Sequence, residues 1–182
     1  MKPDVMKHRI AFVVGALLIT GGLVWGQVAS KPPKPPPEFK PGEPMEQPVP
    51  FSHKKHVGLG LECLDCHTIE DPGDFAGFPA EAKCMACHAA VKADSPHIQE
   101  LAEAEKTSTP IEWNRVYRMK EFVYFSHEVH HREAGVDCTV CHGDVASREV
   151  LFQERSVGMY ACMKCHEQYK APNDCEVCHD TH

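Results

Sequence analysis

Cys138-Thr139-Val140-Cys141-His142 is one of five copies of the same short pattern in this chain of 182 residues. In every copy two residues separate the cysteines, and a histidine directly follows the second cysteine. The other copies begin at Cys63, Cys84, Cys162 and Cys175. The five motifs together contain every cysteine of the chain: Cys63, Cys66, Cys84, Cys87, Cys138, Cys141, Cys162, Cys165, Cys175 and Cys178.

This C-x-x-C-H pattern is the attachment signature of c-type haem. The two thiols add across the haem vinyl groups, and the adjacent histidine reaches the iron as its proximal ligand. The sequence therefore predicts five covalently bound haem c groups. The expected proximal ligands are His67, His88, His142, His166 and His179.

Two other uses of paired cysteines fit the sequence less well. The spacing from Cys63 to Cys87 also fits a zinc ribbon, and ten cysteines could form five disulfides in an exported protein. Five C-x-x-C pairs cannot all combine two by two into four-cysteine sites, however. Neither alternative explains why a histidine follows every pair, so five haem sites remain the better interpretation.

The chain is too short to build a large side-chain core around five haems. The part after Pro50 leaves roughly 26 residues for each haem, and a chain that thin buries little core of its own. We therefore expect a mainly α fold with extensive loops and hardly any sheet, built around stacked haems. The formal net charge of -7 argues against nucleic acid as a partner and is compatible with basic redox partners.

An apolar segment precedes the motifs. Residues 10–30 contain no charged side chain, and as a helix they would span about 30 Å, the thickness of a hydrocarbon core. A cleaved signal peptide is the alternative, but the apolar run is longer than such peptides usually have, and 28–30 is only a fair cleavage site. We predict that residues 1–30 form one retained transmembrane helix. Haem c is attached outside the bacterial cytoplasmic membrane, which places the haem domain on the periplasmic side.

Composition and motif spacing divide the rest of the chain into four parts. Residues 31–50 contain nine prolines, which favour an extended polyproline II linker. A dihaem module (51–105), a haem-free connector (106–124) and a trihaem module (125–182) follow. Within the first module, residues 96–105 have the apolar periodicity of a short amphipathic helix.

Phe51-Ser52-His53-Lys54-Lys55-His56 and Phe125-Ser126-His127-Glu128-Val129-His130 are two copies of one element that precedes a haem motif. The copies differ by one residue in their distance to the next cysteine, and they indicate an internal duplication. Histidines three residues apart project to roughly the same side of a helical turn, so each can reach a different haem. The predicted distal iron ligands are His53, His56, His127 and His130.

One of the five irons then lacks an assigned distal ligand. Met159 is the leading candidate, because a thioether is an established axial ligand that raises the potential of haem iron. Its competing role is to pack against a haem, since methionine fills irregular apolar gaps. His131, His97 and His182 are alternatives, and the site could also be open.

The F-S-H-x-x-H element before C-x-x-C-H resembles that of the class III (tetrahaem) and related small multihaem cytochromes c. This resemblance implies that His53 pairs with His67 and that His127 pairs with His142. The fuller arrangement consists of a membrane helix, two haems, a segment with Trp113, and three haems. It is similar to the membrane-anchored pentahaem subunit of alternative complex III. Tyr117 departs from that pattern, because a histidine is expected at its position.

The resemblance to alternative complex III implies an electron-transfer subunit of a quinol-oxidising respiratory or photosynthetic complex. The implied partners are an iron–sulfur, molybdopterin-like subunit, polytopic quinol-binding membrane subunits, and a soluble or monohaem cytochrome c or an oxidase. With both axial positions filled, the irons would carry electrons without binding substrate, so we expect no catalytic residue. The alternatives are a free-standing, membrane-tethered electron shuttle and, less favoured, a multihaem reductase with one open haem.

Overall fold

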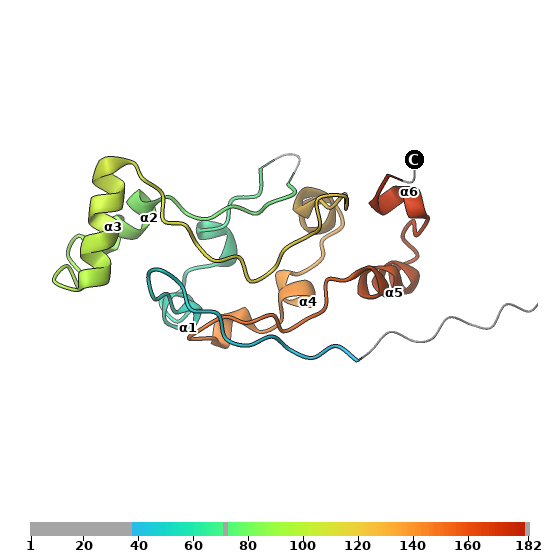
Figure 1. Cartoon of the computed structure of the whole chain (residues 1–182), viewed down its shortest axis with the longest axis horizontal. Helices are drawn as coiled ribbons and strands as arrows, with labels where there is room; N and C mark the ends of the chain where they lie inside the picture. The colour runs from blue at the N-terminus through green and yellow to red at the C-terminus, as the bar shows by residue number, and fades with distance from the viewer. Residues whose placement is uncertain (1–37, 71–72, 181–182) are drawn as a thin grey trace, which may run out of the picture. The chain divides into compact units, whose positions relative to one another are not determined.

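The computed structural model describes residues 38–70 and 73–180 (Figure 1). The predicted transmembrane helix (1–30) and the first part of the proline-rich linker lie outside these residues. Within the described ranges, no helix is both long and apolar enough to cross a membrane.

Short helices joined by long loops make up the described part of the chain, which contains no β-strand (Figure 1). This confirms the expected mainly helical, loop-rich fold. The elements in chain order are α1 (His53–Val57), η1 (Cys63–Asp65), α2 (Glu81–His88), α3 (Pro96–Thr107), η2 (Glu128–Glu133), α4 (Cys138–His142), η3 (Val145–Ser147), α5 (Met159–Tyr169) and α6 (Cys175–Cys178).

Each C-x-x-C-H motif lies on one turn of helix or directly beside it. We number the motifs 1 to 5 in chain order: residues 63–67, 84–88, 138–142, 162–166 and 175–179. Motif 3 shows why such a turn forms, because the Asp137 side chain accepts the Thr139 N–H at 2.8 Å and caps the start of α4. Helical spacing then brings the two cysteines of a motif to one side of the turn.

The side-chain core is small, as the chain length predicts. The apolar side chains buried among the described residues are Val49, Ile69, Ile98, Leu101 and Ala104. Three of them, Val49, Ile98 and Leu101, form one cluster between α3 and the linker, and α3 also packs against α2. The helix predicted for residues 96–105 is therefore confirmed, and it continues to Thr107.

The two copies of the F-S-H-x-x-H element, 51–56 (the first copy) and 125–130 (the second copy), are bonded to each other's modules. The Lys54 N–H in the first copy donates to the Arg148 carbonyl, in the loop after motif 3, at 3.0 Å. The His127 N–H in the second copy donates to the Gly73 carbonyl, in the loop after motif 1, at 2.5 Å. Each copy is thus held by the loop that follows the other copy's haem motif.

Candidate functional site

The first histidine of each copy faces the histidine of the motif that follows it. The ring centres of His53 and His67 are 6.3 Å apart, with only 7° between the ring planes. In the second copy His127 and His142 are also 6.3 Å apart, with 11° between their planes. The structure thus brings together the two pairs that the resemblance to class III cytochromes implies.

The second histidine of each copy faces a more distant motif. His56 lies opposite His88 of motif 2 at 6.2 Å, with an interplanar angle of 52°. His130 lies opposite His166 of motif 4 at 5.9 Å and 45°. The same three-residue spacing therefore directs neighbouring histidines to different motifs in both copies.

The separation within these four pairs fits a haem iron between two imidazoles. An imidazole nitrogen lies about 2 Å from a bound metal and about 1.1 Å from its own ring centre, so two axial imidazoles on one metal have centres about 6.2 Å apart. The four observed separations, 5.9 to 6.3 Å, agree with that value. The side chains present therefore fit bis-histidine haem c.

Backbone carbonyls fix the tautomer of most of these histidines. Because a carbonyl oxygen can only accept, each bonded Nδ1 carries the proton and leaves the lone pair of Nε2 for a metal. The bonds span 2.5 to 3.0 Å and run from His56 to Ser52, His67 to Gly77, His88 to Val91, His127 to Gly73, His130 to Ser126, His131 to Val136 and His166 to Pro172.

Burial keeps several of these imidazoles in the neutral form that binds metals. Desolvation, followed by the neighbouring His67 and His56, lowers the pKa of His53 to about 4. Desolvation is also the main cause that lowers the pKa of His127 and of His142. The Nδ1 atom of His53 is buried without a hydrogen-bond partner, in contrast to the bonded Nδ1 of His127.

The aromatic residue and the serine of each copy orient its two histidines. Phe51 stacks on His56 with ring centres 4.3 Å apart and contacts His53 edge-on at 4.9 Å. The Ser52 hydroxyl accepts the Lys55 N–H at 3.1 Å and caps α1. Phe125 and Ser126 make the equivalent contacts in the second copy. The F-S-H-x-x-H pattern is therefore a complete local unit that presents two imidazoles.

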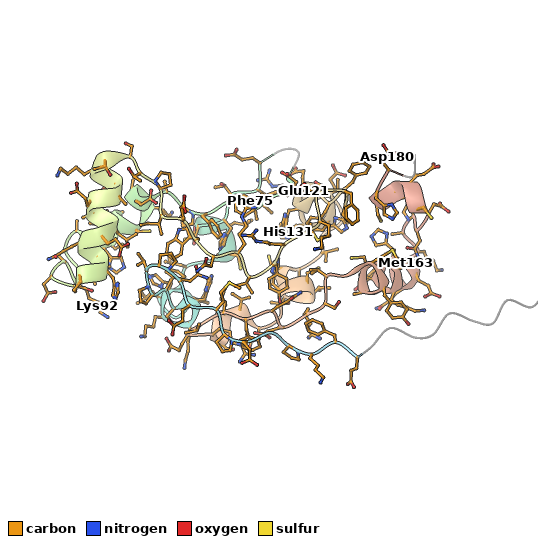
Figure 2. All side chains as sticks on the ribbon, in the orientation of Figure 1. Phe75, Lys92, Glu121, His131, Met163 and Asp180 are labelled. Atoms are coloured by element: carbon orange, nitrogen blue, oxygen red, sulfur yellow. The ribbon has the colours of Figure 1, made fainter. Side chains whose placement is uncertain are left out.

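The candidates for the remaining distal ligand lie in different places. Met159 is the first residue of α5 and is 67 % exposed. His97 is an exposed residue near the start of α3, and His182 lies outside the described residues. His131 lies on η2 (Figure 2), where its Nδ1 is bonded like that of the predicted ligands. No ring in the described ranges contacts His179 of motif 5, so the fifth pairing stays a prediction.

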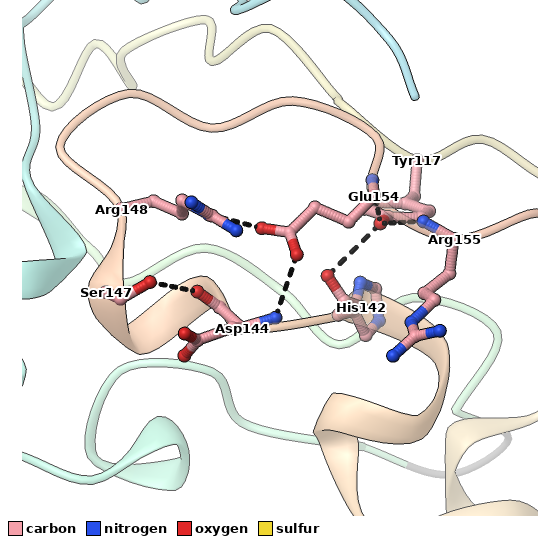
Figure 3. A network of polar contacts seen from close by, with 7 residues as sticks. All are labelled: Tyr117, His142, Asp144, Ser147, Arg148, Glu154 and Arg155. Atoms are coloured by element: carbon pink, nitrogen blue, oxygen red, sulfur yellow. Dashed lines mark hydrogen bonds and ion pairs between the residues drawn. The ribbon is translucent and has the colours of Figure 1, made fainter. Parts of the chain in front are cut away.

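A polar network surrounds the backbone of motif 3 (Figure 3). The Tyr117 hydroxyl donates to the His142 carbonyl at 3.2 Å and accepts the N–H groups of Glu154 and Arg155 at 2.8 and 3.2 Å. The Tyr117 ring also lies edge-on to the His142 imidazole, with centres 4.6 Å apart. Tyr117, which departs from the expected histidine, therefore supports the His142 ring and backbone of motif 3.

Glu154 joins this network to the loop after motif 3. Its carboxylate accepts the Arg148 Nε–H at 2.5 Å and the Asp144 N–H at 3.0 Å (Figure 3). The hydrogen bond from Arg148 is the main cause that holds the pKa of Glu154 below its usual value. No sequence pattern indicated this arrangement, and Tyr117 joins it from a segment 25 residues before His142.

None of the ten cysteines, all of which lie in the described ranges, is paired in a disulfide. In the described ranges, no group of three or more cysteine, histidine or acidic side chains could hold a metal ion. Burial is the main cause that raises the pKa of Cys138, and Cys63, at the equivalent position of motif 1, raises it further.

Comparisons with known proteins identify two families and one relative. Residues 28–108 match the class III cytochrome c family, and residues 123–180 match the family of cytochrome c7 and related cytochromes c. The multihaem cytochrome c subunit of menaquinone reductase from Nitratidesulfovibrio vulgaris is 30 % identical to this chain over 161 residues. The aligned region covers 74 % of this chain and 77 % of that relative.

Proposed function

The chain belongs to the multihaem cytochromes c of the class III type, and we propose that it is the pentahaem electron-transfer subunit of a membrane-bound, quinol-oxidising complex. In this proposal residues 1–30 anchor the chain in the cytoplasmic membrane, and residues 31–50 link the anchor to a periplasmic haem domain. The dihaem module (51–105), the connector (106–124) and the trihaem module (125–182) make up that domain.

The observation that carries the proposal is the set of four facing histidine pairs at 5.9 to 6.3 Å. An iron with imidazole on both sides has no free position for a substrate, so such sites suit electron transfer rather than catalysis. Haem c supplies a one-electron Fe(III)/Fe(II) couple when it is bound. We propose no catalytic residue in this chain, and quinol chemistry belongs to a partner subunit.

The residues have three roles in this proposal. The ten cysteines attach five haems, and the histidines that end the five motifs bind the irons on the proximal side. His53, His56, His127 and His130 bind four irons on the distal side, and Met159 remains our proposal for the fifth. The backbone carbonyls bonded to Nδ1 orient the imidazoles and make them better electron donors to iron.

The proposed assembly resembles alternative complex III. An iron–sulfur, molybdopterin-like subunit and polytopic quinol-binding subunits would be its membrane partners. A soluble or monohaem cytochrome c, or a terminal oxidase, would accept the electrons. The relative in Nitratidesulfovibrio vulgaris is named as a subunit of a menaquinone reductase. This name favours a second candidate, in which electrons pass through this subunit toward the quinone.

Mild detergent extraction of native membranes tests the assembly. The solubilised proteins are separated on a native gel, the bands are stained for haem, and each band is identified by mass spectrometry. We expect this chain in a large band together with an iron–sulfur subunit and polytopic membrane subunits. Migration alone, or with one small partner, would defeat the proposed complex and leave a tethered electron shuttle.

Anaerobic spectroscopy of the same large band separates the two directions of electron flow. If the complex oxidises quinol, a short-chain menaquinol reduces the haems and their α band grows. If it reduces quinone, haems that have been reduced beforehand lose that band when menaquinone is added, and menaquinol has little effect. The same band, boiled before the assay, serves as the control for a non-enzymatic reaction.

A further inference from the structure

The five haem motifs need not follow each other in space as they do along the chain. Three independent sets of contacts place one motif beside another. They are the spacing within each F-S-H-x-x-H copy, the bonds between the two copies, and the fold of the segment that carries motif 5.

The two copies place motif 1 beside motif 2, and motif 3 beside motif 4. His53 and His56 stand three residues apart on α1, and they face His67 of motif 1 and His88 of motif 2. His127 and His130 do the same for motifs 3 and 4. One helical turn thus separates the histidines that face each pair of motifs, so the motifs within each pair are neighbours.

The bonds from each copy to the loop after the other copy's motif place motif 1 beside motif 3. Two backbone bonds cross this junction, from the Lys54 N–H to the Arg148 carbonyl and from the His127 N–H to the Gly73 carbonyl. Cys63 and Cys138, the first cysteines of motifs 1 and 3, agree with them, because Cys63 is near enough to raise the pKa of Cys138 after the larger effect of burial. In addition, Arg132 of η2 donates to the Ile69 carbonyl, just after motif 1, at 2.7 Å.

The C-terminal segment places motif 5 beside motif 4. The loop between them folds back on α5, where Asn173 donates to the Met163 carbonyl at 3.0 Å and the His166 ring donates to Pro172. The cysteines agree with this neighbourhood. Burial raises the pKa of Cys162, and the nearby Cys178 of motif 5 raises it further. The Tyr124 N–H also donates to the Cys178 carbonyl at 2.6 Å, which holds motif 5 near the second copy.

From these contacts we infer that the haem motifs form a single row in the spatial order 2–1–3–4–5. The row is centred on the junction of motifs 1 and 3, the equivalent motifs of the duplicated element. Motifs 2 and 4 flank this centre symmetrically, and motif 5 extends the row at one end only. The chain order, by contrast, would put motif 2 between motifs 1 and 3.

This order names the two places at which partners meet the subunit. It rests on the proposed function for its meaning, since electron transfer requires that a partner reach one end of the row. Motif 2, which lies on α2 next to α3, is one end of the row. Motif 5, which lies on α6, is the other end. The segment around Glu149, which forms ion pairs with Lys54 and Lys55 near the junction, lies by the middle of the row.

The positions of the five irons test the order directly. We would collect anomalous diffraction at the iron edge, or a cryo-EM map, from the full-length holoprotein and assign each iron by its motif. The expected result is one row in which irons 1 and 3 are neighbours and irons 2 and 5 are the ends. A map in which iron 2 lies next to iron 3, or iron 5 next to iron 1, would overturn the inference. This result does not depend on any partner.

Zero-length carbodiimide cross-linking of the native membrane complex tests whether partner subunits bind at the motif 2 and motif 5 ends of the row. The expected partner cross-links involve Glu103 on α3, beside motif 2, and Glu176 on α6, within motif 5, both of which are exposed. Glu149, with 49 % exposure, is the matched carboxylate at the middle of the row. Cross-links at Glu149 in place of the two end positions would overturn the assignment of the ends. No partner cross-link at any position would instead count against the proposed function, while the iron positions still decide the order.

Discussion

The first copy (51–56) and the second copy (125–130) hold their histidines in nearly the same geometry on different backbones. The first copy begins an ordinary α-helix, α1, whereas the second continues into η2, a π-helix of six residues. Even so, the first pairs are both 6.3 Å apart with near-parallel rings, and the second pairs are both tilted. The geometry of the pairs thus follows the short F-S-H-x-x-H pattern rather than the helix type.

The π-helix explains how the second copy absorbs its extra residue. The distance from the phenylalanine to the next cysteine is one residue longer there than in the first copy. A π-turn accommodates one inserted residue without disturbing the turns on either side, and such turns are frequent at functional sites. His131 lies in this lengthened segment on η2, with its Nδ1 bonded to the Val136 carbonyl at 2.9 Å. The second copy therefore keeps the histidine geometry of the first and has one further oriented imidazole beside it.

Loss of a distal histidine has the largest expected effect and tests whether the copies are equivalent. We expect His127→Ala to convert one iron per chain from low spin to high spin, because the iron loses its sixth ligand. His53→Ala should do the same in the first copy, and Lys55→Ala, at an exposed residue of that copy, serves as the control. Quantitative EPR of the oxidised protein measures the high-spin fraction. An unchanged low-spin spectrum in His127→Ala, or an equal high-spin signal in Lys55→Ala, would contradict the ligand assignment.

Substitution of Gly73 should disrupt the contact between the second copy and the loop after motif 1. Gly73 has a φ of +75°, and a Cβ atom there would lie 2.7 Å from the Glu128 nitrogen. We expect Gly73→Ala to lower the free energy of unfolding by about 3 kcal/mol, because backbone strain adds to a clash with backbone. Gly60 has a φ of +90° and open space around it, so Gly60→Ala should cost only about 1–2 kcal/mol. Denaturant unfolding of the holoprotein measures both, and equal losses would contradict the proposed contact.

Tyr117→Phe tests the hydrogen-bond network around motif 3, which motif 1 lacks among the described contacts. The substitution leaves the His142 carbonyl and the N–H groups of Glu154 and Arg155 without their shared partner. We expect a loss of about 1–3 kcal/mol of stability, the cost of unpaired polar groups. Tyr169→Phe, at a residue that is 63 % exposed, should change stability by less than about 0.5 kcal/mol. Thermal unfolding compares the two variants, and equal effects would show that the network contributes nothing.

The smallest expected effect is a difference between irons of the unaltered protein. Near-parallel axial imidazoles and tilted ones split the iron d orbitals differently, so the ferric EPR signals differ in anisotropy. The rings are 7° and 11° from parallel in the first pairs, against 52° and 45° in the second pairs. We expect two classes of low-spin signal, with at least two irons in each class. A single class of signal for all irons would contradict the difference in ring angle between the first and the second pairs.

Much of the candidate site was predictable because it is encoded locally. Each haem motif places two thiols and a histidine within five residues, and F-S-H-x-x-H contains its own cap and its own aromatic support. The amphipathic helix after motif 2 was predictable for the same reason, since its buried residues Ile98 and Leu101 recur at helical spacing. The contacts of Gly73 and Tyr117 were not predictable, because they join residues 54 and 25 positions apart in the chain.

The sequence by itself determined the ten thiols, the five expected proximal histidines and the four histidines that present themselves in two equivalent pairs. These features depend on spacings of one to four residues, which the geometry of a helical turn converts directly into position. The tertiary structure decided which histidine faces which motif, which carbonyls orient the imidazoles, and how the two copies meet. Such contacts depend on the path of long loops with little side-chain core to constrain them. Only the folded chain, with motif 1 brought against motif 3, fixes that path.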